Sequence, residues 1–146
     1  MTAFHIALGT ALIVVNAAAA IWGGAQWRRG RTSRVFWPLL RAGQALVVAE
    51  ALDGGILLLG GRALPSLHLI YGLVPLAVSF VAEQLRLVAA DQVLENRGLA
   101  GRADVESLSP DDQGALVRAI LRREMGVMAA SAGVVALLGV RAAGLL

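Results

Sequence analysis

The sequence predicts an all-α, polytopic membrane protein built as a bundle of four transmembrane helices. Hydrophobic residues make up 58% of the 146 positions and charged residues only 16%, whereas charged residues approach a quarter of an ordinary soluble domain. The mean hydropathy is +0.71, which is too apolar for a disordered chain. The length accommodates about four spans of roughly 20 residues each, with their connections. We therefore expect a single transmembrane domain covering residues 1–146.

The first and second spans are expected at residues 3–22 and 38–60. Only three polar side chains interrupt the first span, and the chain start has no positive charge of the kind that begins a cleaved signal peptide. This segment is therefore predicted to be a retained transmembrane helix. Pro38 suits the first turn of the second helix, because its missing N–H would be unpaired there in any case. Gly60 and Gly61 are typical of the turn that ends the helix.

The third and fourth spans are expected at residues 64–85 and 124–141, joined by a charged segment at 86–123. The third helix is predicted to continue beyond the membrane as far as Asn96, because glycines follow soon afterwards. Ser109 then supplies a hydroxyl N-cap, and a proline and two aspartates follow it at the start of a helix. No proline separates this start from the fourth span, so the charged segment is expected to form a helical hairpin between helices 3 and 4.

The arginines give the expected orientation in the membrane. All 13 basic residues are arginine, and 11 of them lie in the loop after the first span or between residues 86 and 123, leaving Arg62 and Arg141. Cytoplasmic loops are enriched in basic residues, so we expect a multi-pass plasma-membrane protein with both termini outside and a cytoplasmic hairpin. The basic surface is expected to contact anionic lipid headgroups, and nucleic acid is not expected as a partner. It includes Arg28, Arg29, Arg31, Arg34, Arg122 and Arg123.

Two carboxylates lie within the second predicted span. A charge at the centre of a bilayer costs about 2.5–3.5 kcal/mol even on the lenient insertion scale. Glu50 and Asp53 must therefore face the protein interior and be paired, protonated or hydrated. Residues near the outer ends of the third and fourth helices are within reach of these acids. We predict an intramembrane polar site in the outer half of the bundle, formed by Glu50, Asp53, His68, Tyr71 and Arg141.

A purely structural interpretation of these polar residues stays open. Polar side chains inside a membrane commonly hydrogen-bond across a helix seam, because lipid offers them no partners. In that interpretation Asp53 forms an ion pair with Arg141, and His68 or Tyr71 donates a hydrogen bond to Glu50.

No catalytic signature is found in the sequence. It lacks G-x-S-x-G, H-E-x-x-H, a phosphate-binding loop with a lysine, and any cysteine. We therefore expect no enzymatic activity, and no metal or cofactor. The leading hypothesis is a non-catalytic accessory or interaction subunit of a membrane assembly. It would dock through its hairpin on a membrane-protein partner or on a second copy of itself.

Two alternative functions come from the intramembrane residues. The first is a proton-coupled carrier or channel for a small solute, in which Glu50 and Asp53 share a proton in a low-dielectric site. Four short helices leave little room for alternating access, so this function would require an oligomer. The second is a b-type haem redox protein with His5 and His68 as weak candidate axial ligands. A histidine so near the chain start is more commonly an interfacial residue.

Three stretches of the chain carry a family resemblance. They are WRRGRTSRVFWPLLRAGQALVVAEAL at 27–52, LHLIYGLVPLAVSFVAEQLRL at 67–87 and ILRREMGVMA at 120–129. Their arginine-rich aromatic loop, His-x-x-Tyr-Gly entry and Arg-Arg-Glu entry resemble small, uncharacterised four-helix integral membrane proteins of high-GC actinobacteria. Since no activity is established for such proteins, the resemblance implies the four-helix architecture and assigns no site residue.

Overall fold

The computed structural model describes residues 3–61 and 66–145, and this part of the chain is helical apart from its connections. The helices are α1 (Ala3–Arg28), α2 (Phe36–Leu59), α3 (Ser66–Glu95), α4 (Arg102–Glu106) and α5 (Pro110–Ala142). Helices α1, α2, α3 and α5 are each long and apolar enough to cross a membrane. The predicted all-α class with four potential spans is therefore confirmed.

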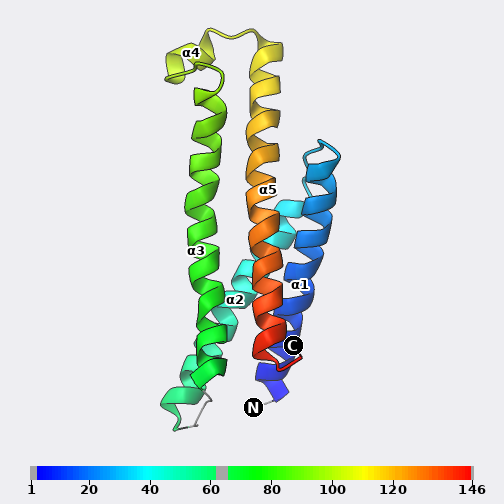
Figure 1. The fold of residues 1–146 in the computed structure, drawn as a ribbon, viewed down its shortest axis with the longest axis vertical. Helices are drawn as coiled ribbons and strands as arrows, with labels where there is room; N and C mark the ends of the chain where they lie inside the picture. Colours follow the sequence, from blue (N-terminus) through cyan, green and yellow to red (C-terminus); the bar gives the residue numbers. More distant parts are fainter. Residues whose placement is uncertain (1–2, 62–65, 146) are drawn as a thin grey trace.

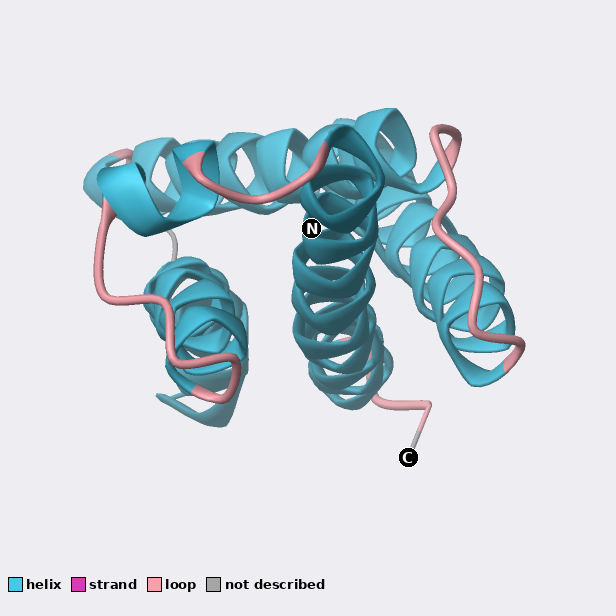
Figure 2. Cartoon of the chain, turned by 90° about the horizontal axis from the view of Figure 1, so that it is seen from above, coloured by secondary structure: helices cyan, strands magenta, loops and turns pink. Residues whose placement is uncertain are grey.

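Three of the long helices lie side by side, and the fourth crosses them. Helix α5 is central and packs along both α1 and α3. Helix α2 crosses behind these three helices at a marked tilt and packs mainly against α1, with fewer contacts to α3 and α5 (Figure 1, Figure 2). Its N-terminal end contributes Phe36 and Leu40 to a buried core with Met125 and Met128 of α5.

Small residues allow the helices to approach closely at this core. A Cβ added at Gly23 of α1 would lie 2.5 Å from a ring carbon of Phe36, so only glycine admits that ring. Two turns earlier on α1, Asn16 is buried, with a relative exposure of 1%. Its side-chain amide donates hydrogen bonds to the carbonyl oxygens of Leu12, at 2.9 Å, and of Gly43 in α2, at 3.4 Å. The Asn16 amide is thus hydrogen-bonded within the protein, as polar groups between membrane helices commonly are.

The long helices extend beyond the expected spans where polar residues begin. Helix α1 continues to Arg28, which lies in its last turn and not in the following loop. Helix α3 continues to Glu95, and Gly98 with φ of +68° lies in the connection that follows. Ser109 caps α5, because its hydroxyl oxygen accepts a hydrogen bond from the Asp112 N–H at 3.2 Å. Hydropathy marks where a membrane could end, whereas the helix ends where backbone hydrogen bonding stops.

Helices α3 and α5 continue together past the loop between α1 and α2, and the short α4 connects them there (Figure 1). This arrangement has the connectivity expected of the segment 86–123, while its cytoplasmic location remains a prediction. Arg62, one of the two arginines expected on the opposite side, lies outside the described residues, as do residues 64 and 65 of the expected third span.

A polar cluster links three helices midway along the bundle. Glu83 of α3 forms an ion pair with Arg41 of α2 and accepts a hydrogen bond from Gln44 at 2.9 Å. Arg86 of α3 lies 3.1 Å from the other Glu83 carboxylate oxygen and 3.7 Å from Glu124 of α5. The positive charges of Arg41 and Arg86 balance the negative charges of the two acids. We therefore interpret this cluster as a structural crosslink between the helices.

Candidate functional site

The candidate site lies at the end of the bundle where both chain termini are found (Figure 1). His5 comes from the first turns of α1, and Glu50 and Asp53, three residues apart, share one face of α2. His68 and Tyr71 enter from the start of α3, while Arg141 belongs to the last turn of α5. The fold thus brings the five predicted site residues to the same end of the molecule.

His5 lies between the two carboxylates of α2. Its Nδ1 atom is 2.9 Å from Asp53 Oδ2, and its Nε2 atom is 3.3 Å from Glu50 Oε1. The side chain is buried, with a relative exposure of 5%. The expectation of an interfacial histidine therefore differs from the structure, in which α1 packs on α2 with His5 facing the acids.

One glycine beside this histidine makes room for the approach of Glu50. A Cβ at Gly9 would lie 3.1 Å from Glu50 Oε1, closer than an ordinary contact, whereas a Cβ at Gly54 would lie at an ordinary 3.8 Å from the His5 ring. His5, Gly9 and Asn16 follow the helical spacing of four and seven residues, so they occupy one face of α1. That shared face with the buried Asn16 is the sequence signal that could have placed His5 inside.

The contacts of His5 restrict its protonation. A neutral imidazole carries a single N–H, so it can donate to only one of the two carboxylates. Both contacts become hydrogen bonds if His5 is an imidazolium, or if one of the acids is protonated and donates to the ring. Either arrangement leaves one net negative charge on the three groups. The second oxygen of Glu50 is buried with no hydrogen-bond partner among the described residues.

The remaining site residues make contacts with α5. His68 Nδ1 lies 3.1 Å from the carbonyl oxygen of Ala142, an acceptor, so this nitrogen carries the proton. The guanidinium of Arg141 lies 5.6 Å from the centre of the Tyr71 ring, in cation–π contact. The His68 ring is also 5.8 Å from the His5 ring, centre to centre. Glu50 therefore meets His5, and not the His68 or Tyr71 partner of the structural interpretation.

A cavity of about 560 Å³ adjoins this cluster. His5, Glu50, His68 and Tyr71 contribute its polar lining, and the other side chains lining it are mostly aliphatic, among them Ile13 of α1. A volume in this range is typical of sites for small molecules, which combine apolar walls with a few polar groups. The arrangement can hold a proton next to a space for a small solute.

The side chains of the cluster are not arranged as ligands of a metal ion or of a haem iron. No group of three or more His, Asp and Glu side chains within residues 3–61 and 66–145 is arranged to hold a metal ion. Both nitrogens of His5 lie against carboxylates, so neither is directed at an iron between His5 and His68. The geometry favours a proton-binding role for His5 over that of an axial ligand.

The fold and the site together define an all-helical chain with four potential membrane spans and a buried His–carboxylate cluster. Comparison with protein-family models, with curated proteins and with solved structures found no match to this chain.

Proposed function

We propose that this chain is a proton-coupled membrane carrier or channel for a small solute. In this proposal His5, Glu50 and Asp53 are the proton-binding group, and the adjoining cavity is the solute site. The observation that carries it is the position of His5 between two carboxylates at 2.9 and 3.3 Å, on the wall of a cavity of about 560 Å³.

The cluster supports a proton relay through the imidazole ring. In one state a protonated Glu50 donates to His5 Nε2 while Nδ1–H donates to Asp53. When Glu50 gives its proton to Nε2, and Nδ1 gives its proton to Asp53, the ring remains neutral and a proton has moved from one acid to the other. Asp53 lies about 4.5 Å further along α2 than Glu50. Histidine is suited to this role because its two nitrogens can exchange donor and acceptor functions.

The cavity indicates the chemical class of the solute. Its walls are mostly aliphatic, and the Glu50 carboxyl group on its lining has one oxygen without a hydrogen-bond partner in the described structure. The unpartnered oxygen is itself buried, so the solute class follows from the aliphatic walls and from the position of the Glu50 carboxyl group on the lining. These two features suit a small solute with an apolar body and a hydrogen-bond donor or a positive charge. We expect the active form to be an oligomer, because four helices provide little room for alternating access.

The proton-binding role is tested by infrared difference spectroscopy of the protein in lipid vesicles. Transfer from mildly acidic buffer, in which exposed carboxyl groups are already ionised, to alkaline buffer should remove a protonated-carboxyl band, and Glu50→Gln or Asp53→Asn should diminish that change. Glu95→Gln is the matched control, because Glu95 is exposed at the opposite end of α3. An unchanged band in both site variants would remove the cluster from the mechanism.

The transport role is tested separately by proton flux into vesicles that contain a pH-sensitive dye. We expect flux through the wild-type protein to fall at least about tenfold in His5→Ala, because the relay requires the ring, and general acid–base groups contribute about 100-fold or more to proton transfer in other sites. Equal flux through wild type and His5→Ala would contradict the relay.

The accessory-subunit hypothesis and the haem hypothesis remain predictions with their own tests. A protein that purifies alone as a monomer, and that is unaffected by deletion of residues 98–112, would oppose an accessory role. The absorbance spectrum of protein purified from its native membrane tests for haem, because a Soret band would be required.

A further inference from the structure

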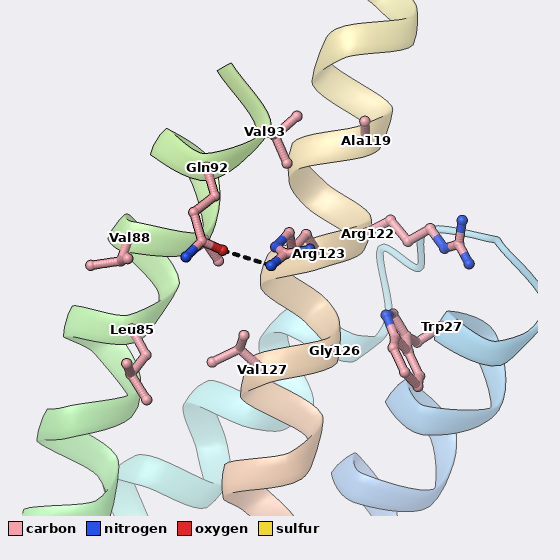
Figure 3. Close-up of a pocket in the computed structure, with 11 residues that line it drawn as sticks. Trp27, Leu85, Val88, Gln92, Val93, Ala119, Arg122, Arg123, Gly126 and Val127 are labelled. Atoms are coloured by element: carbon pink, nitrogen blue, oxygen red, sulfur yellow. Dashed lines mark hydrogen bonds between the residues drawn. The ribbon is translucent and has the colours of Figure 1, made fainter. Parts of the chain in front are cut away.

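A second cavity lies far from the His5 cluster, between α3 and α5 and next to the end of α1 (Figure 3). Its volume is about 740 Å³. We call it the α3–α5 groove. It is lined at one end by Trp27, Gln92, Arg122 and Arg123, and elsewhere mostly by aliphatic side chains.

The walls of the groove are apolar and accessible from outside. They include Leu85 and Val88 of α3, whose relative exposures are 52% and 49%. Ala119 and Val127 line the facing side on α5. Leu85 lies at the end of the expected third span and Val127 near the start of the expected fourth span, so we expect an acyl chain in a bilayer to reach the groove from this side.

The polar end of the groove carries positive charge without a nearby acid. Arg122 and Arg123 are both exposed, and neither takes part in an ion pair within the described residues. Arg123 donates a hydrogen bond of 2.6 Å to the Gln92 side chain, which is neutral and leaves the charge uncompensated. The adjacent acid on α5, Glu124, lies instead beside Arg86. Figure 3 shows Arg123 directed toward α3 and Arg122 toward the loop after α1.

Trp27 lies at the same end of the groove, from the last turns of α1. Its indole ring covers Gly126, where an added Cβ would be 2.6 Å from the indole nitrogen. The ring remains 45% exposed. Tryptophan is typical of the headgroup level of a bilayer, where arginine side chains also gather. Aliphatic walls, an aromatic ring and two unneutralised arginines therefore follow one another in the order of a phospholipid's chain, glycerol region and phosphate.

We propose that the α3–α5 groove binds one anionic phospholipid, with its phosphate at Arg123 and an acyl chain along α3 and α5, while Arg122, directed toward the loop after α1, adds positive charge near the headgroup. Charge complementarity selects this occupant, since an uncharged lipid would leave both guanidinium groups unneutralised. Basic pockets between membrane helices are known to favour anionic headgroups, and guanidinium suits phosphate through paired hydrogen bonds. This site is independent of the proton-binding cluster.

The proposal is tested by native mass spectrometry of the full-length protein in mild detergent, titrated with phosphatidylglycerol or phosphatidylcholine. We expect one phosphatidylglycerol to be retained, and the double variant Arg122→Gln/Arg123→Gln to weaken its binding about 25-fold, from about fivefold for each arginine. Arg97→Gln/Arg102→Gln removes the same charge from exposed positions outside the groove and should leave binding within about twofold of the wild type.

Two further arms separate this site from simpler explanations. Val127→Phe narrows the part of the groove that we assign to the acyl chain without changing charge, and it should also reduce retention of the lipid. Glycerol 3-phosphate, which has the phosphate without acyl chains, should bind far more weakly than the lipid. The proposal is overturned if the control double variant loses as much affinity as the groove variant, or if phosphatidylcholine or glycerol 3-phosphate binds as well as phosphatidylglycerol.

Discussion

Replacing His5 with alanine removes the group that joins the two acids of α2. The contact with Asp53, at 2.9 Å, has the geometry of a hydrogen bond, and hydrogen bonds to charged groups contribute about 1.5–3 kcal/mol. The contact with Glu50 is longer, at 3.3 Å, and we assign it about 1 kcal/mol. We therefore expect His5→Ala to lower the free energy of unfolding by about 2–4 kcal/mol.

Double-mutant cycles apportion this loss between the two acids. His5→Ala combined with Asp53→Asn should give a coupling energy of about 2 kcal/mol, and His5→Ala combined with Glu50→Gln about 1 kcal/mol. The free energies are measured by reversible unfolding in lipid bicelles. Glu95→Gln, at a distant exposed position, should be additive with His5→Ala within about 0.5 kcal/mol. Coupling energies near zero for both acids would refute the bridging geometry, and a reversed order would refute the assignment of the stronger contact to Asp53.

Three further predictions concern packing, capping and topology. Gly23→Val should lower the unfolding free energy by about 1–3 kcal/mol, because its Cβ would clash with the phenyl ring at the start of α2. The control Gly55→Val, with no neighbour within 4 Å, should lower it less in the same bicelle assay. Equal losses for the two variants would contradict the close approach of α1 and α2 at Gly23. Ser109→Ala should remove about 1 kcal/mol of helix stability and speed amide hydrogen exchange in the first turn of α5, whereas unchanged exchange would contradict the cap. Because the chain has no cysteine, single-cysteine variants Arg31→Cys and Gly144→Cys can be labelled from one side of intact cells; labelling of both from the same side would overturn the predicted topology.

The helices could be predicted from the sequence because their signals are local. Four apolar segments gave the number of long helices, and Ser109 followed by proline and two aspartates gave the start of α5. The end of α1 at Arg28 was less predictable. The more polar residues after the expected span indicate where the membrane could end, but they are compatible with a helix that continues beyond it.

The candidate site was only partly predictable because it depends on how helices face one another. The acids of α2 were evident from their cost in a membrane. The partner of those acids could not be selected, since His5, His68, Tyr71 and Arg141 all lie at a similar depth. In the structure α2 crosses α1, and His5 is therefore the side chain that contacts both acids. The two cavities are spaces left by packing, and periodicity carries no information about such spaces.

Helix α5 runs without interruption from Pro110 to Ala142, and no proline follows its first residue. Arg122, at the α3–α5 groove, and Arg141, beside Tyr71, are 19 residues apart on this rod, which corresponds to about 28 Å. A helix without an internal proline is expected to curve gently and to have no sharp kink. One uninterrupted element therefore lines both cavities, the α3–α5 groove through Arg122 and the cavity beside His5 through Gly139.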